Sequence, residues 1–250
     1  MMYRFLAPLL AGFALAGASA FTAAFSRRWG VRGGQIATSV LRNLLGIPLY
    51  FLGIVLAWQA PAPLLFDSGT ATQVAAWALI VTSSIPVIVG HLQLGWSTHM
   101  PSLRDSLVTT GLYAHVRHPI YAGALPLFIG LALLRPSATF ALACALSCAF
   151  FVIQARLEEI DLIERLPEYR EYMRRVPALL PRSGIRQPAG ASSESPFARW
   201  WWLCPWLAIA LAAALFVLWG LTWWTALLAA LMLVCPALMI WGLGVLSRKP

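Results

Sequence analysis

Long apolar runs, bounded by short polar stretches, occupy most of the chain. A helix needs about 20 residues to cross the hydrocarbon core of a bilayer. Runs of about that length lie near residues 5–25, 37–59, 72–95, 199–220 and 222–245. Two further runs, near 119–134 and 136–156, are separated by Arg135 and Pro136 and predict a tight helical hairpin. The pattern therefore predicts an all-α fold, a polytopic membrane bundle of about seven transmembrane helices.

Composition and charge agree with this interpretation. The chain is 60% hydrophobic and 11% charged, whereas soluble domains are about 25% charged. An alternating seven-span path places almost all cationic residues on one side and only Arg4 and Arg135 on the other. The positive-inside rule then puts the N-terminus outside and the C-terminus in the cytoplasm. The net charge of +9 is thus a topology signal, with a secondary role in holding anionic lipid headgroups, and does not indicate nucleic-acid binding.

The first apolar run has an alternative interpretation. Arg4, the run itself and Ala18-Ser19-Ala20 also resemble a secretory signal peptide with a small-residue cleavage site. Its removal would leave Arg27, Arg28 and Arg32 outside, against the charge bias, so a membrane span is favoured.

A segment rich in Gly, Ser and Pro divides the chain. Residues 183–197 are predicted to be a linker between a five-span body, 1–182, and a C-terminal two-span hairpin, 198–250. Tryptophans at both ends of the hairpin are expected to be interface anchors, with contact to a lipid substrate as the alternative: Trp200, Trp201, Trp202, Trp206, Trp223 and Trp224.

Cysteine and histidine usage gives no sign of a metal site. Cys144, Cys148, Cys204 and Cys235 lie in apolar runs without metal-ligand spacing, and are expected to be small buried side chains. His91 is the lone histidine inside a predicted span, where an interhelical hydrogen bond is favoured over a role in a site.

The most polar stretch is residues 110–123, Thr-Gly-Leu-Tyr-Ala-His-Val-Arg-His-Pro-Ile-Tyr-Ala-Gly. Pro119 is predicted near the first position of a helix, where its missing N–H costs nothing. Arg117 and His118 then lie at the helix N-terminus, whose free N–H groups favour an anion such as a carboxylate.

Two carboxylates follow about forty residues later. The spacing of apolar residues from Leu157 to Leu166 predicts that the helix of the fifth span continues, with Glu158 and Glu159 at its first cytosolic turn. Carboxylates this close to hydrocarbon require cations, and salt bridges to Arg156 or Arg117 are one explanation. The hairpin also brings them near 117–123 and a set of aromatic rings, Tyr113, Tyr121, Tyr169 and Tyr172. Together these groups suit a zwitterionic amino-acid moiety and an attached sulfonium.

These motifs resemble those of the isoprenylcysteine carboxyl methyltransferase and phospholipid methyltransferase superfamily. The resemblance covers roughly residues 85–182 and rests on Gly-x-Tyr-x-x-x-Arg-His-Pro-x-Tyr-x-Gly, on the Glu-Glu pair, and on Glu168-Tyr169-x-x-Tyr172-x-x-x-Val176-Pro177-x-x-x-Pro181. Leu112 stands where the family often has proline, and Pro167 where glycine is common.

The resemblance implies an S-adenosylmethionine-dependent methyltransferase with a cytosolic-side cofactor pocket. Either Glu158 or Glu159 would hold the methionine ammonium, Arg174 or Arg175 would orient an anionic acceptor, and Glu158 would be the base for an amine acceptor. The residues implied to bind the cofactor are Tyr113, Arg117, His118, Pro119, Tyr121, Gly123, Glu159 and Tyr172.

The acceptor is expected to be lipidic and to enter laterally from the bilayer. An isoprenylcysteine carboxylate is favoured, and phospholipid amines, small thiols and other lipidic carboxylates are also compatible. One alternative is an NADPH-dependent reductase of the sterol-reductase type, which shares the Arg-His-Pro-x-Tyr-x-Gly run. Another is a non-enzymatic membrane protein such as a transporter. Charged residues are almost absent from the predicted spans, with Arg42 as the main exception, which argues against an ion pathway. Neither a P-loop, a His-Glu-x-x-His motif nor a Gly-x-Ser-x-Gly elbow occurs in the sequence.

Overall fold

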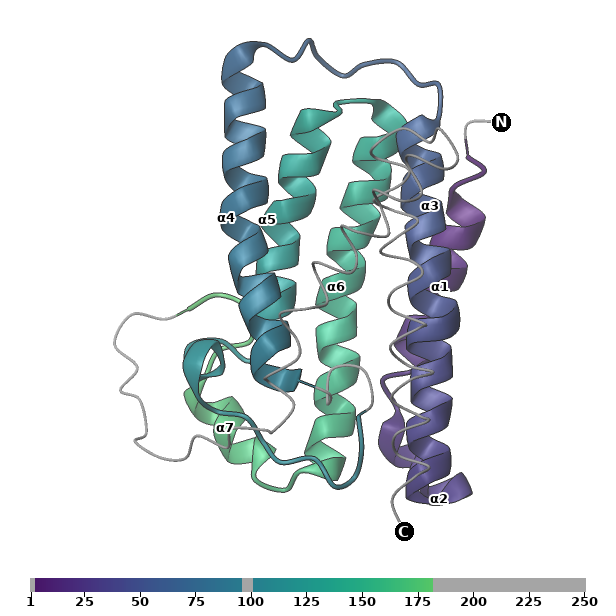
Figure 1. Ribbon diagram of the computed structural model, residues 1–250, viewed down its shortest axis with the longest axis vertical. Coiled ribbons are helices and arrows are strands. Elements are labelled where there is room, and N and C mark those ends of the chain that lie inside the picture. The colour runs from purple at the N-terminus through teal and green to yellow at the C-terminus, as the bar shows by residue number, and fades with distance from the viewer. Residues whose placement is uncertain (1–2, 96–100, 182–250) are drawn as a thin grey trace, which may run out of the picture.

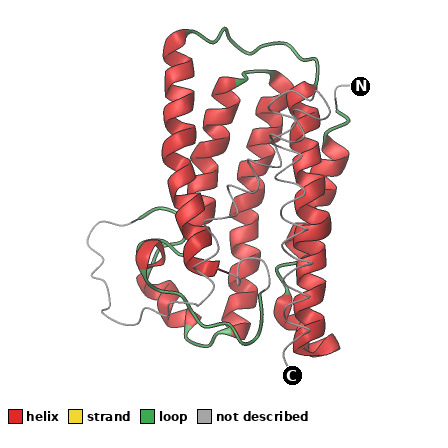
Figure 2. Ribbon diagram, in the orientation of Figure 1, coloured by secondary structure: helices red, strands yellow, loops and turns green. Residues whose placement is uncertain are grey.

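A computed structural model describes residues 3–95 and 101–181, which form a bundle of helices joined by loops (Figures 1 and 2). The α-helices are α1 (Leu6–Ala18), α2 (Thr22–Ser39), α3 (Ile47–Gln59), α4 (Thr70–Leu94), α5 (Pro119–Leu134), α6 (Ala138–Arg165) and α7 (Tyr169–Arg175). A π-helix, η1 (Val40–Gly46), joins α2 to α3, and a 3-10 helix, η3 (Gly111–Ala114), precedes α5. The described residues contain helices and an isolated bridge between Leu64 and Ser137, and no strand.

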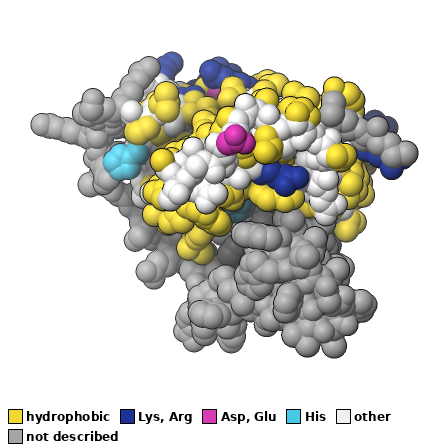
Figure 3. Space-filling view, turned by 90° about the horizontal axis from the view of Figure 1, so that it is seen from above, with side chains coloured by type: hydrophobic (Ala, Val, Ile, Leu, Met, Phe, Trp, Pro, Cys, Tyr) yellow, Lys and Arg dark blue, Asp and Glu magenta, His cyan; other side chains and the backbone are white. Residues whose placement is uncertain are grey.

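Within the described residues, three helical stretches are long and apolar enough to cross a membrane: Thr22–Gln59, Thr70–Leu94 and Ala138–Arg165. The outer face of α4 carries exposed apolar side chains at helical spacing, including Val74, Val81 and Ile88. The end of the molecule shown in Figure 3 likewise exposes many hydrophobic side chains among few charged ones. These features confirm the helical, membrane-embedded character that the apolar runs predict. The runs near 199–220 and 222–245 lie outside the described residues.

The first apolar run differs from its prediction, because it is not one continuous helix. α1 ends at Ala18, the Ser19 hydroxyl donates to Ala16 O at 2.6 Å, and α2 begins at Thr22. The Asp161 carboxylate caps this new start by accepting from the Ala23 N–H at 2.7 Å. Gly30 has φ +73°, and helical residues on its two sides fold against each other. The helix containing the second run therefore starts well before residue 37.

Close backbone contacts hold α1 against η1 and α3. A Cβ added to Gly12 would lie 2.5 Å from Tyr50 N, and one added to Gly53 would lie 2.7 Å from Leu9 Cα. Small residues permit this approach, which is the main route to tight helix packing in a bilayer. Phe5, Leu9 and Phe140 complete a buried cluster where α1, α3 and α6 meet.

The bundle has two ends that differ in chemistry. At the polar end α5 begins, α6 ends and α7 packs beside them; at the far end α5 turns into α6 (Figure 1). The segment after α7 is tied to the start of α5, since the N–H groups of Arg117 and His118 donate to Pro177 O and Ala178 O at 2.9 and 3.0 Å. This pairing fixes the motif-bearing residues beside the segment that follows α7.

Candidate functional site

Arg117 fastens three segments together at the polar end. Its Nε and Nη2 donate to Glu159 Oε1 at 3.0 and 2.7 Å, while Nη1 donates to Met173 O and Val176 O at 2.9 and 2.8 Å. The side chain is only 8% exposed. A buried guanidinium with this many acceptors has a positioning role, because its fork geometry fixes the carboxylate and both carbonyls.

Glu159 contacts two arginines and a histidine. Besides Arg117, His118 Nε2 lies 3.2 Å from Oε1 and Arg156 Nη1 donates to Oε2 at 3.2 Å. The Glu159 side chain is 5% exposed, and Glu159 is absent from the lining of the large cavity described below. The salt-bridge explanation offered by the sequence is therefore the arrangement that the structure shows for Glu159.

Glu158 has different surroundings although it is the neighbouring residue. Its Oε1 accepts hydrogen bonds from Tyr121 Oη at 2.7 Å, Arg42 Nη2 at 3.1 Å and Gln154 Nε2 at 3.2 Å. Among the described residues, none donates to Oε2. The carboxylate is thus oriented through one oxygen, and the other keeps its capacity to bind a cation.

A cavity of about 1110 Å³ runs from this polar end into the apolar bundle. Its polar part is lined by Arg42, His91, Tyr113, Arg117, His118, Tyr121, Gln154, Glu158, Tyr169 and Tyr172. Its apolar part is lined by side chains of α3, α5 and α6, among them Ile54, Phe128 and Phe140. Pockets for cofactors and drug-sized ligands occupy about 300–1,000 Å³, so the cavity can hold a cofactor together with part of a second molecule.

Several cavity-lining residues carry buried polar atoms without a hydrogen-bond partner among the described residues. Two of these atoms, Tyr169 Oη and Gln154 Oε1, lie at the polar end. Such atoms are uncommon, because leaving a buried polar group unpaired costs about 1–3 kcal/mol. Both belong to residues near Glu158 in the polar part of the cavity. A polar ligand bound there would satisfy them.

The tyrosines of the polar end keep their hydroxyl groups protonated and neutral. Burial raises the pKa of Tyr113, Tyr169 and Tyr172 well above the ordinary value of a phenol, with a further upward effect of the Glu158 charge on the pKa of Tyr113. Tyr172 Oη donates to Tyr113 O at 2.6 Å and joins α7 to η3. The tyrosines therefore act as hydrogen-bond donors and ring faces, not as bases.

Other predicted site residues lie elsewhere. Pro119 is the first residue of α5, as expected, and is fully buried. Arg174 and Arg175 are exposed and pair with Glu171 at 3.1 and 3.4 Å. The structure does not bring these two arginines to the cavity, and their role with an anionic acceptor stays a prediction.

Gly123 faces α4. A Cβ at this position would lie 2.7 Å from Ser83 O and 2.8 Å from Pro86 Cγ. The glycine thus permits the close approach of α5 to α4. Its contact with a cofactor stays a prediction.

Gly123→Ala is expected to destabilise the protein by about 1–3 kcal/mol, because the added methyl group forces α4 and α5 apart. Thermal unfolding in detergent measures this loss. Gly69→Ala is the matched control, since a Cβ there meets nothing within 4 Å. Equal unfolding temperatures for the two variants would contradict the packing role of Gly123.

The sequence did not assign Arg42 to the site. Its Nε donates to Ser19 Oγ at 3.2 Å, and its Nη2 reaches Glu158 from η1, on the opposite side of the cavity mouth. π-Helical turns often occur at functional sites because they redirect side chains. A lone arginine in an apolar run was the available signal, but hydropathy alone does not show where it points.

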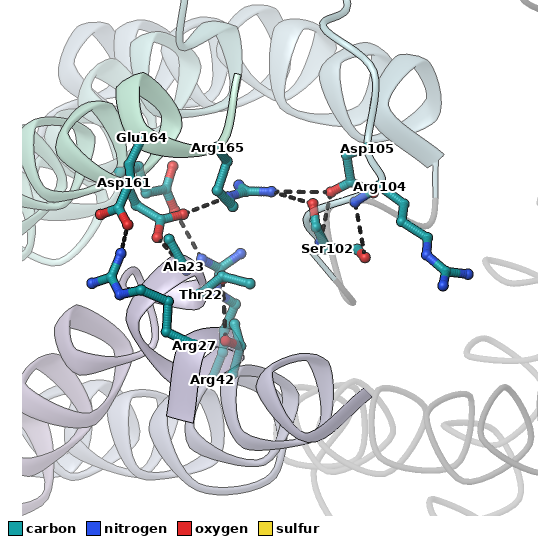
Figure 4. Close-up of polar contacts among 12 residues, drawn as sticks. Thr22, Ala23, Arg27, Arg42, Ser102, Arg104, Asp105, Asp161, Glu164 and Arg165 are labelled. Atoms are coloured by element: carbon teal, nitrogen blue, oxygen red, sulfur yellow. Dashed lines mark hydrogen bonds and ion pairs between the residues drawn. The ribbon is translucent and has the colours of Figure 1, made fainter. Parts of the chain in front are cut away.

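A second polar group closes the same end of the bundle (Figure 4). Arg165 donates to Asp161 Oδ2 at 2.5 Å, to Ser102 O at 2.7 Å and to Asp105 Oδ2 at 3.3 Å. Asp161 also caps α2, and Arg27 pairs with Glu164 on the surface. These contacts tie the segment after α4 to α6 and α2. They fix the positions of Asp105, Asp161 and Arg165, which line the cavity at this end.

The described hydrogen bond of His91 lies within its own helix, whereas the sequence favoured an interhelical one, and the two described cysteines are small buried or half-buried side chains as expected. His91 Nδ1 is 2.7 Å from Val87 O of its own helix, and the ring lines the cavity. Cys144 is buried and Cys148 half-buried, both as free thiols. In the described ranges, His, Cys, Asp and Glu form no group that could hold a metal ion.

The segment that carries the motifs matches a known protein family. Residues 71–166 match the phospholipid methyltransferase family. The resemblance of this segment to the phospholipid methyltransferase family is confirmed. Arg117, His118, Tyr121 and both glutamates lie within the matched residues, whereas Arg42, Tyr169 and Tyr172 lie outside them.

Several curated relatives share parts of the chain. Methanethiol S-methyltransferase 2 of Bradyrhizobium diazoefficiens is 33% identical over 182 residues, which are 61% of this chain and 62% of that protein. Methanethiol S-methyltransferase of a Pseudomonas species is 28% identical over 163 residues, 58% and 59% of the two chains. The nickel-cobalt-cadmium resistance protein NccN of Alcaligenes xylosoxydans is 34% identical over 111 residues, 43% and 52% of the two chains. The matched part of this chain covers 52–62% of the length of these relatives, and no solved structure matches it.

Proposed function

We propose that the protein is a membrane methyltransferase that takes a methyl group from S-adenosylmethionine and transfers it to a lipidic or membrane-associated acceptor. The observation that carries the proposal is Glu158: a carboxylate oriented through one oxygen, in a large cavity, within the segment related to phospholipid methyltransferases. We place the active site at the cytosolic membrane face, with the N-terminus outside and the C-terminus in the cytoplasm, on the basis of the charge bias.

The residues of the polar end fit the cofactor. Glu158 Oε2 has the free acceptor capacity that an ammonium requires, and the unpaired Tyr169 hydroxyl and Gln154 oxygen can bond the remaining polar groups. The faces of Tyr113, Tyr121 and Tyr172 suit a sulfonium. We assign the ammonium to Glu158, because Glu159 already pairs with Arg117 and Arg156 and also contacts His118.

Once bound, S-adenosylmethionine supplies an electrophilic methyl group that is transferred when nucleophile, carbon and sulfur lie in line. The protein contributes position and a dry environment: Tyr121 and Arg42 fix Glu158, and the apolar wall excludes water from the reacting atoms. In this arrangement Oε2 of Glu158 pairs with the cofactor ammonium and Oε1 accepts three hydrogen bonds, so Glu158 is already engaged and is not positioned to take a proton from the acceptor. An acceptor that carries no proton to remove, a carboxylate or a thiolate, is therefore favoured over an amine.

The length of the apolar part of the cavity supports a lipidic acceptor of the isoprenylcysteine carboxylate type, entering from the bilayer. A small thiol is the second candidate, because two of the relatives are named methanethiol S-methyltransferases. Transfer of a radiolabelled methyl group from S-adenosylmethionine to farnesylcysteine, methanethiol and phosphatidylethanolamine, offered separately, tests the choice. Labelling of the farnesylated carboxylate supports the proposal, labelling of methanethiol alone selects the second candidate, and labelling of neither contradicts both.

Arg42→Gln is expected to weaken S-adenosylmethionine binding about tenfold, a loss of about 1.4 kcal/mol, because Glu158 loses one of the three donors that orient it. Binding of 5′-methylthioadenosine, which lacks the amino-acid moiety, is expected to stay within twofold. Calorimetric titration of the parent protein and of Arg42→Gln with each ligand measures both affinities. Equal losses for both would show that Arg42 only supports the fold.

A further inference from the structure

A single arginine lines the far end of the cavity. Arg135 follows the last residue of α5, and its guanidinium carbon lies 5.2 Å from the centroid of the Trp58 ring. Leu131, Leu134, Trp58 and Phe140 line the same end of the cavity. At 1.5 Å per helical residue, α5 separates Arg135 from Tyr121 at the polar end by roughly 21 Å.

The charge of Arg135 is not balanced by the described part of the protein. Its Nε is buried without a hydrogen-bond partner, and no ion pair joins its guanidinium to any described residue. Its guanidinium lies over the ring of Trp58. Arg135 is half-buried, and a cation–π contact contributes only about 0.5–2 kcal/mol and supplies no counter-charge. The site therefore favours an anion.

The position of Arg135 is fixed by the loop that precedes α4. Leu65 N donates to Pro136 O at 2.7 Å and Ala138 N donates to Pro63 O at 3.0 Å, so residues 63–65 hold the α5–α6 turn through two backbone hydrogen bonds. Ser137 caps α6 by accepting from Phe140 N at 3.4 Å. A guanidinium on a fixed turn loses little freedom when it binds a ligand, which favours affinity.

The wall between the two ends of the cavity is apolar. Ile54 from α3, Leu127 and Phe128 from α5, and Phe151 from α6 line it without a charged side chain among them. An occupant with its anion at Arg135 would lay an alkyl chain along this wall, toward the polar end. A small anion would leave the wall uncovered.

We propose that the far end of the cavity is a binding site for an anionic amphiphile, whose carboxylate or phosphate pairs with Arg135 and whose alkyl chain follows the apolar wall. Carboxylate and phosphate both match the planar fork of arginine. Such a molecule reaches the cavity from the leaflet nearer to Arg135. The site shares its apolar wall with the acceptor proposed above, but binding at Arg135 does not depend on methyl transfer.

The test is photolabelling of the full chain in a non-ionic detergent with palmitate that carries a diazirine in mid-chain. Label is expected on peptides from α3 and α5, and Arg135→Gln is expected to reduce it at least fivefold. Arg4→Gln is the matched control, because it removes the same charge from an exposed arginine that precedes α1, at the same end of the bundle (Figure 1). Its labelling is expected to stay within twofold of the parent.

Competition on the parent protein gives a second readout that needs no variant. Unlabelled palmitate is expected to displace the label, while hexadecanol and inorganic phosphate are not. Equal competition by hexadecanol, or equal labelling of Arg135→Gln, would show that the chain alone is recognised and would overturn the proposal. Competition by phosphate as strong as by palmitate would make this a small-anion site and would also overturn it.

Discussion

Glu158→Gln is expected to weaken S-adenosylmethionine binding about 30-fold or more, which corresponds to about 2 kcal/mol. The substitution removes the charge that would pair with the cofactor ammonium. A glutamine at this position still offers an oxygen to Tyr121 and Arg42, so the hydrogen bonds that orient residue 158 can persist. Calorimetric titration of the purified variant measures the loss.

Glu164→Gln is the control for this experiment. Glu164 lies in the same helix, is 46% exposed and pairs with Arg27 outside the cavity. Its variant carries the same change of charge and should bind the cofactor as the parent does. If Glu158→Gln and Glu164→Gln bind equally well, Glu158 does not hold the ammonium.

Glu159→Gln is expected to act on stability instead. Arg117 is buried, and losing its carboxylate partner leaves a guanidinium without a counter-charge. Breaking a buried ion pair by removing one partner costs about 3–5 kcal/mol. We therefore expect a marked fall in the unfolding temperature in detergent, measured by scanning fluorimetry.

Arg156→Gln tests the same carboxylate from its exposed side. Arg156 is 68% exposed, so its pair with Glu159 should contribute less than about 1 kcal/mol. A Glu159→Gln protein that is as stable as Arg156→Gln but no longer binds S-adenosylmethionine would move the ammonium site from Glu158 to Glu159.

The hydropathy pattern locates the helices that carry the motifs. The runs near 72–95 and 119–134 correspond to α4 and α5, and Arg135-Pro136 separates α5 from α6 as predicted. The break between α1 and α2 escapes the pattern, because Ser19, Ala20 and Phe21 interrupt the helix within an apolar sequence. What fixes the break is tertiary: the cap on Ala23 comes from Asp161, 138 residues away in the sequence.

The two motif segments of the site could be predicted, but the division of work between the glutamates could not. Neighbouring residues on a helix point about 100° apart, so one of the pair must face away from the other's partners. Which one faces the cavity depends on Arg117, in the loop before α5, and on Arg42, in a π-helix. The sequence offers Arg117 as a partner for the pair, but spacing along the chain does not show which glutamate it contacts, and it gives no sign that Arg42 reaches the other.

The central claim is that the cavity binds S-adenosylmethionine, and the most direct measurement is calorimetric titration of the full chain in detergent with S-adenosylmethionine, S-adenosylhomocysteine and NADPH. We predict binding of both adenosyl ligands at micromolar concentrations, lost in Glu158→Gln, and no binding of NADPH. Tight binding of NADPH without either adenosyl ligand would contradict the account in favour of a reductase, and binding of none of the three would favour a non-enzymatic membrane protein.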